Sequence, residues 1–227
     1  DTIINLTELR KTMNDYVRGV PEHFGAYFEY LPSGSSISIN AQDPFIAASL
    51  LKVPVAIEVF KMKNQGLLAL DDIVEIQKQD IDSNFGTLWL RGVGTKMTIL
   101  EVVKTMLQES DDTALRVLQR TLQDLYPLFL NDVFDDLDIP KELSKEAVVV
   151  SPKNYTSVLR SLYLASSLPK EDAQAILGIM TGGLFKDKIP AGVPSGIPVA
   201  HKVGVFEPTQ EDIVRMLSAL WCRHQNK

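Results

Sequence analysis

The 227-residue sequence contains a single cysteine, Cys222, and only three histidines. One cysteine excludes an internal disulfide and a cysteine-rich metal site. His23, His201 and His224 are too far apart along the chain to form a pair of metal ligands on one helix. We therefore expect no metal site.

Basic clusters and long apolar runs are also missing. The net charge is −6 and no block of lysine and arginine occurs, so we expect no nucleic-acid partner. No apolar run approaches the roughly 18 residues of a membrane span. No signal peptide is recognised, and a sequence that begins at Asp1 without a methionine is interpreted as a mature or trimmed form.

The remaining composition is that of an ordinary globular protein, with 45% hydrophobic and 23% charged residues. A chain of this length can bury a sizeable core and suits one large domain or two interleaved ones. Apolar periodicity predicts helices at residues 2–20, 50–64, 98–107, 113–125, 151–164, 169–180 and 209–224, strands at 25–31, 36–40 and 199–206, a solvated turn at 135–140 and an irregular segment at 189–198.

The most informative stretch is Ala47 to Val55, which opens an apolar helical run. Ser49 and Lys52 are three residues apart, so on a helix they share one face. Burial would lower the pKa of the lysine and let it act as a base that activates the serine hydroxyl. The alternative is that Ser49 only caps the helix and Lys52 is a solvated side chain.

Two further short stretches carry polar residues of the same kind. Ser110 stands before Asp111 and Asp112, and Lys202 begins the triplet that ends at Gly204. Taken alone, the first stretch is typical of a helix-capping turn and the second of an exposed strand lysine.

Taken together, Ser49-Leu50-Leu51-Lys52, Ser110-Asp111-Asp112 and Lys202-Val203-Gly204 resemble the three motifs of the penicillin-recognising serine hydrolases. This family comprises the class A β-lactamases and related D-alanyl-D-alanine peptidases. The resemblance extends to the hairpin at 25–40, to residues 96–98 and to residues 187–192, and so covers nearly the whole chain up to Val205.

The resemblance implies a role for each motif residue. Ser49 would attack a carbonyl carbon, Lys52 would take its proton, and Ser110 would pass a proton to the departing nitrogen. Lys202 would attract the substrate carboxylate, and Gly204 would let the substrate backbone approach closely.

The resemblance also implies the oxyanion hole, formed by the backbone N–H of Ser49 and one near Val205. It implies an α/β (α+β) fold of one β-lactamase-like domain. Residues 1–45 and 199–227 would build a lobe with an antiparallel sheet, and residues 46–198 a mostly helical lobe. It further implies no cofactor, and a place outside the bacterial cytoplasmic membrane. We expect a monomer.

Three departures from the family pattern concern the site. Asp112 stands where the family usually has asparagine, so a substrate carbonyl loses its amide donors and Lys52 is held in its charged form. Val203 replaces a threonine or serine that would bind the substrate carboxylate. Glu142 and Glu146 lie in the region of the family's deacylating glutamate, but neither fits its pattern, and both are interpreted as solvated carboxylates.

A fourth departure is architectural. The family has a long β-hairpin after the position of Gly204, whereas residues 205–208 here pass almost directly into the predicted helix at 209–224. Loss of those strands would leave backbone ladders unpaired. We therefore expect a segment to be missing near Pro208.

The leading hypothesis is a serine hydrolase that acts on β-lactams or D-alanyl peptide-like amides through an acyl-Ser49 intermediate. Asp112, Val203 and the absent glutamate pattern favour one alternative, a penicillin-binding or sensor module with slow or no deacylation. The other alternative is an esterase-like hydrolase that needs only Ser49 and Lys52. The expected partner is a small β-lactam or peptidoglycan-peptide-like substrate.

Overall fold

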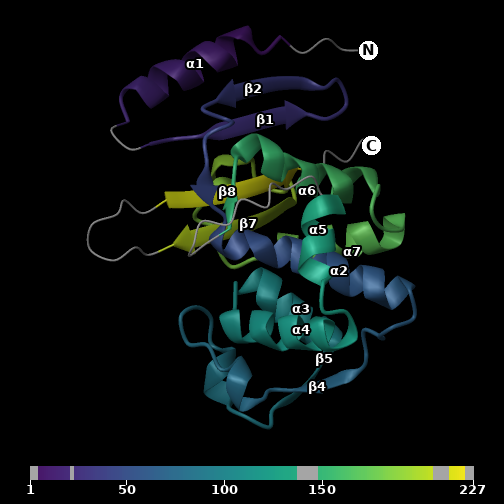
Figure 1. The fold of residues 1–227 in the computed structure, drawn as a ribbon. Coiled ribbons are helices and arrows are strands. Elements are labelled where there is room, and N and C mark those ends of the chain that lie inside the picture. The colour runs from purple at the N-terminus through teal and green to yellow at the C-terminus, as the bar shows by residue number, and fades with distance from the viewer. Residues whose placement is uncertain (1–4, 21–22, 137–147, 207–214, 223–227) are drawn as a thin grey trace.

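The computed structural model describes residues 5–20, 23–136, 148–206 and 215–222. Helix α1 and a two-stranded hairpin lie at one end of the molecule, and helices α3 and α4 with a second small sheet lie at the other (Figure 1). The elements in chain order are α1 (Thr7–Arg18), β1 (Ala26–Tyr30), β2 (Ser35–Ile39), β3 (Phe45–Ile46), α2 (Lys52–Asn64), β4 (Ile73–Glu75), β5 (Lys96–Thr98), α3 (Ile99–Gln108), α4 (Asp112–Leu125), α5 (Phe129–Asp136), β6 (Val149–Val150), α6 (Pro152–Leu164), α7 (Lys170–Thr181), β7 (Val199–Phe206) and β8 (Arg215–Cys222).

Helix α2 is the centre of the core. Its residues 52–60 are all buried, because the sequence there is apolar on every side of the helix apart from Lys52 and Glu58. Such a helix is stable only when it is covered all round. It packs against α3, α4, α5 and α7, and it runs between the β7–β8 hairpin and helices α3 and α4 (Figure 1).

Local capping signals place the helix starts as predicted. The Thr98 hydroxyl accepts a hydrogen bond from the backbone N–H of Glu101 at 3.2 Å, and the Glu101 carboxylate accepts one from the N–H of Thr98 at 2.8 Å. This reciprocal pair is a capping box, and it fixes the first turn of α3. Ser151 caps α6 through its hydroxyl, with Pro152 in the first turn.

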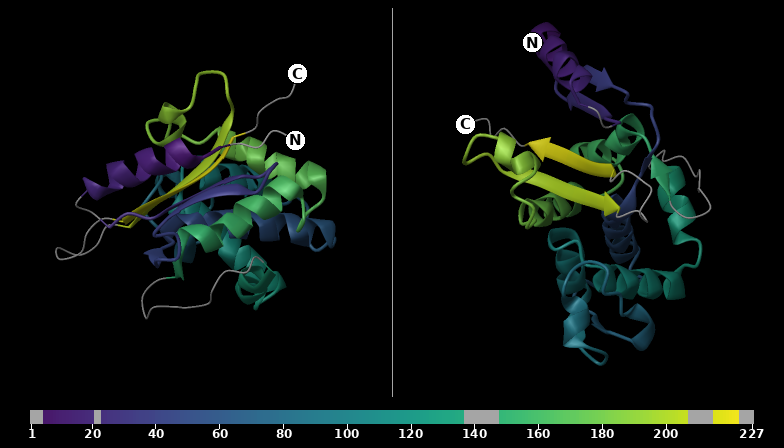
Figure 2. Two further views of the ribbon diagram at one scale, coloured as in Figure 1. Left: turned by 90° about the horizontal axis from the view of Figure 1, so that it is seen from above. Right: turned by 90° about the vertical axis from the view of Figure 1, so that its left-hand side faces the viewer.

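Every strand pair in the described chain is antiparallel, and the strands form four two-stranded sheets. Strand β1 pairs with β2 from Ala26 opposite Ile39 to Tyr30 opposite Ser35, as the predicted hairpin requires. This hairpin and the β7–β8 hairpin are separate sheets (Figure 2).

The prediction of a helix at 209–224 is wrong. Residues Arg215–Cys222 form strand β8, which pairs with β7 from Val199 opposite Cys222 to Phe206 opposite Arg215. The apolar run in this segment fits a buried strand as well as a helix, and the edge of β7 decides between them. One strand of the hairpin expected to be missing after Gly204 is therefore present. Residues 207–214, where we expected a deleted segment, lie outside the described residues.

One smaller prediction also needs correction. Asp135 and Asp136 end helix α5 and do not begin a solvated turn, and residues 137–140 lie outside the described part of the chain. The helix predicted at 2–20 is confirmed as α1, and none of the residues of α1 is buried, with Tyr16 71% exposed. No helix among the described residues is long and apolar enough to span a bilayer. The division into two lobes at residues 45 and 198 stays a prediction.

Candidate active site

Ser49 lies in a short 3₁₀ turn, Ala48–Leu51, that leads directly into α2. Ala48 has a φ of 45°, a left-handed conformation that is strained for a residue with a side chain. Two hydrogen bonds hold this turn: Ala47 N–H donates to the carbonyl of Val148 at 2.9 Å, and the hydroxyl of Tyr155 donates to the carbonyl of Leu50 at 2.8 Å. The nucleophile candidate therefore stands on a turn that the surrounding elements fix in place.

Lys52 is completely buried and its ammonium group points to the serines of the site. Its Nζ donates to Ser49 Oγ at 2.8 Å, to the Ser110 carbonyl at 2.6 Å and to Asp112 Oδ1 at 2.6 Å. The structure thus brings the first two predicted motifs together. The alternative interpretation, in which Lys52 is a solvated side chain, is wrong because the residue is buried.

Ser110 follows α3 and comes just before α4. Its φ of 59° is also left-handed, and this strained backbone directs the residue to the two lysines. Asp111 is the N-cap of α4: its buried carboxylate accepts from the N–H of Ala114 at 2.8 Å and from the N–H of Leu88 at 2.7 Å. The capping interpretation is therefore correct for Asp111, and it is compatible with a functional Ser110.

Lys202 comes from β7 and approaches the same serine from the other side. Its Nζ donates to Ser110 Oγ at 2.6 Å and to its neighbour's carbonyl, Val203 O, at 2.8 Å. The side chain is 1% exposed, so the interpretation as an exposed strand lysine is wrong. Ser110 Oγ also lies 3.4 Å from Lys52 Nζ, and it therefore links the two lysines.

The two lysines of the site differ in the groups that set their pKa values. Burial lowers the pKa of Lys52, while the hydrogen bond and the charge of Asp112 act to raise it. Burial and the neighbouring Lys52 hold the pKa of Lys202 well below its ordinary value, and Asp112 opposes this only weakly. Of the two lysines, Lys52 has the carboxylate partner, whereas Lys202 has a hydroxyl and a carbonyl.

Gly204 makes a close contact within the protein itself, while the approach of a substrate backbone to this glycine stays a prediction. A Cβ at this position would lie 2.8 Å from the carbonyl oxygen of Ala47 and 3.1 Å from Leu50 Cγ. The missing side chain thus lets β7 pack closely against the turn that carries Ser49. Val203 is buried and Val205 is half-buried; the role of the Val205 N–H in an oxyanion hole stays a prediction.

We expect Gly204→Ala to lower the free energy of unfolding by about 1–3 kcal/mol, because the new methyl group must displace backbone. Gly178→Ala is the matched control. Gly178 lies inside α7 with nothing within 4 Å of an added Cβ, so alanine is expected to stabilise that helix by up to about 1 kcal/mol. Urea unfolding of both variants measures the difference; equal stability of the two would contradict the close packing of β7.

Sequence reasoning missed an aromatic contact next to the site. The rings of Phe85 and Phe185 have centroids 5.9 Å apart, and the Phe85 carbonyl accepts a hydrogen bond from the N–H of Asp112 at 3.0 Å. The two phenylalanines are a hundred positions apart, so no local pattern could pair them. Glu142 and Glu146 lie outside the described residues.

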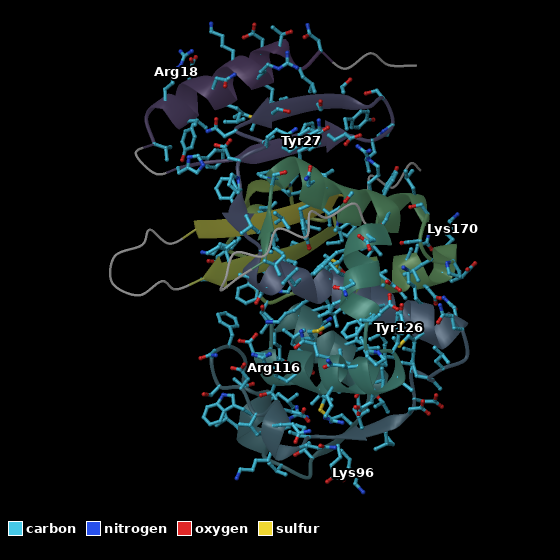
Figure 3. The ribbon with its side chains drawn as sticks, in the orientation of Figure 1. Arg18, Tyr27, Lys96, Arg116, Tyr126 and Lys170 are labelled. Carbon is cyan, nitrogen blue, oxygen red and sulfur yellow. The ribbon has the colours of Figure 1, made fainter. Side chains whose placement is uncertain are left out.

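Ionic contacts fix the segment before Phe85 to α4. Asp80 is buried and its carboxylate accepts from Arg120 at 2.9 Å. Arg116, labelled in Figure 3, lies 3.3 Å from the carboxylate of Asp82. Asp82 is one of the acidic residues whose charge acts on Lys52.

Comparison with known proteins agrees with this geometry. The model of the β-lactamase enzyme family matches residues 8–216. The chain is 27% identical over 192 residues to β-lactamase 3 of Bacillus cereus, which covers 79% of this chain and 60% of that protein. It is 28% identical over 182 residues to β-lactamase Toho-1 of Escherichia coli, which covers 75% of this chain and 62% of that protein. The chain thus spans about 60% of the length of the curated relatives that it matches.

Solved structures have the same fold. The extended-spectrum β-lactamase TLA-3 superposes with a TM-score of 0.84 at 16% identity, over 96% of this chain and 85% of that one. A point mutant of PBP-A, solved as an acyl-enzyme complex with penicillin G, superposes with a TM-score of 0.79 at 23% identity, over 95% of this chain and 87% of that one. At these identities the superpositions establish the fold, and the family model establishes the kinship. This chain belongs to the β-lactamase enzyme family.

Proposed function

We propose that the protein is a serine hydrolase that opens β-lactams or D-alanyl-peptide-like amides through an acyl-Ser49 intermediate. One observation carries the proposal: the fully buried amine of Lys52 lies 2.8 Å from Ser49 Oγ. This is the distance that proton transfer from a nucleophile to its base needs. The relatives' names support the β-lactam as the substrate class.

In the proposed acylation, Ser49 Oγ bonds to the carbonyl carbon and its proton passes to the neutral amine of Lys52. The N–H groups of Ser49 and Val205 would stabilise the oxyanion. As the carbon–nitrogen bond breaks, the nitrogen takes the proton of Ser110 Oγ. Lys202, at 2.6 Å, and Lys52, at 3.4 Å, are both placed to return a proton to that oxygen.

A second candidate function, a binding or sensor module, is favoured by the Lys52–Asp112 contact of 2.6 Å. A carboxylate at this distance favours the protonated form of the lysine against the effect of burial, and a protonated lysine is no base. Such a module would form the acyl-enzyme and release it slowly. Both functions place the substrate outside the cytoplasmic membrane, which supports the proposal of an extracytoplasmic protein.

Intact-protein mass spectrometry tests the proposal with a panel of penicillins and cephalosporins. A mass increase equal to the intact drug, mapped by digestion to the peptide with Ser49, is the expected result. The lifetime of that adduct separates hydrolase from sensor, since the hydrolase returns to the free mass with loss of intact drug. No adduct and no loss of any drug would overturn both functions.

The base also predicts the pH dependence of acylation. Because the neutral form of Lys52 is required, the acylation rate should rise as the pH rises through the pKa of Lys52. Burial lowers that pKa and Asp112 acts to raise it. The Asp112→Asn variant is therefore expected to show the rise of its acylation rate at a lower pH than the native protein. Acylation rates measured across the pH range for both proteins give the comparison. A rise that stays at the same pH would show that another group is the base.

A further inference from the structure

Asp112 is the most accessible charged group in the site, and half of its carboxylate has no partner among the described residues. Its side chain is 21% exposed, whereas that of Lys52 is completely buried and Lys202 is 1% exposed. Oδ1 accepts from Lys52 at 2.6 Å. Oδ2 makes no hydrogen bond within the part of the chain that the structure describes. A buried lysine therefore orients the carboxylate, and its second oxygen is free to accept from a ligand.

The carboxylate of Asp112 lies close to the hydroxyl of Ser49, the proposed nucleophile. Ser49 Oγ and Asp112 Oδ1 are both hydrogen-bonded to the same nitrogen, Lys52 Nζ, at 2.8 and 2.6 Å. The distance between Ser49 Oγ and Asp112 Oδ1 is thus at most the sum of these two hydrogen-bond lengths. A substituent a few bonds away from the carbonyl that Ser49 attacks can reach Asp112.

The chemistry of a carboxylate decides which substituent fits. An ionised carboxylate only accepts hydrogen bonds, so it repels an amide carbonyl and favours N–H donors, of which a protonated amine is the strongest. The nearby cations do not cancel this preference. Lys52 is already bonded to Oδ1, and burial lowers the pKa of Lys202.

We propose that Asp112 selects acyl donors whose acyl side chain carries a protonated amine. The inference rests on the proposed function and names its substrate class. Phe85 adds to it: its carbonyl is hydrogen-bonded to the N–H of Asp112, and its 36% exposed side chain contacts the ring of Phe185. An acyl side chain with both an amine and an aromatic ring suits this pair of surfaces.

Penicillin G and ampicillin are the matched probes, because they differ by one amino group on the carbon next to the side-chain carbonyl. Second-order acylation rates are measured by intact mass at about pH 6.5, below the ordinary pKa of an α-amino group. The native protein is expected to favour ampicillin by about tenfold, the scale of one charge-assisted hydrogen bond. Asp112→Asn is expected to bring the ratio of the two rates close to one. Its effect on the base changes both rates alike.

Asp82→Asn is the control variant. Asp82 also acts on Lys52 by its charge, but its carboxylate is bonded to Arg116. This variant is expected to keep the preference for ampicillin. Equal rates in the native protein, or a preference that survives Asp112→Asn, would overturn the inference while leaving the proposed function intact. No adduct and no loss of intact drug with either compound would overturn the proposed function, and the inference with it.

Discussion

Replacing Ser49 with alanine is expected to abolish the covalent adduct with every β-lactam that labels the native protein. The substitution removes the only atom that bonds to the substrate carbonyl in the proposed mechanism, and the loss in acylation rate should be at least about 10⁴-fold. The backbone should keep its place, because Ala47 and Leu50 bind their neighbours through main-chain atoms. Intact-mass spectra of the two proteins after the same incubation make the comparison.

Ser195→Ala is the control for this experiment. Ser195 is exposed in the segment before β7, away from the Ser49 turn in the chain. Its alanine variant should form as much adduct as the native protein. A persistent adduct of the same mass on the Ser49→Ala protein would show that another residue is the nucleophile. Digestion of that adduct would then decide whether Ser110 has taken the role.

Local signals in the sequence predicted most helix boundaries because local chemistry determines them. The hydroxyls of Thr98 and Ser151 satisfy backbone N–H groups that a helix start leaves free, whatever the rest of the fold does. The Ser49–Lys52 contact is local in the same sense, since the two residues are one turn apart. Such features are readable from a few neighbouring residues.

Contacts between distant segments were not readable in that way. The chain from 215 to 222 is a strand because β7 offers it an edge, and no local pattern reveals that edge. Lys202 is buried because Ser110, 92 residues earlier, accepts its hydrogen bond. The family resemblance predicted that the three motifs form one site, and the structure gives the distances between their residues.

Gly204 illustrates the same distinction between local and distant contacts. A glycine in a strand indicates that something approaches the backbone closely, but it does not say what. The resemblance suggested the substrate, and the structure shows the carbonyl of Ala47 and the side chain of Leu50. Glycine at this position thus acts on the site through the placement of the Ser49 turn.

Replacing Lys52 with methionine is expected to slow acylation by about 10³-fold, within the range of a lost general base. Methionine fills a similar volume, but it leaves Ser49 without a proton acceptor. It also removes the partner of Asp112, so that a partly buried carboxylate loses its compensating charge. Stopped-flow acylation with a chromogenic cephalosporin and urea unfolding measure the two effects separately.

The double variant, Lys52→Met with Asp112→Asn, distinguishes chemistry from stability. The double variant no longer has the unpaired carboxylate of Asp112, so its free energy of unfolding is expected to exceed that of the single variant by about 1–3 kcal/mol. Its acylation should stay as slow as that of the single variant, because neither substitution supplies a base. If acylation recovered together with stability, the defect of the single variant would be structural. The base would then be Lys202, acting through the hydroxyl of Ser110 that lies 2.6 Å from its amine.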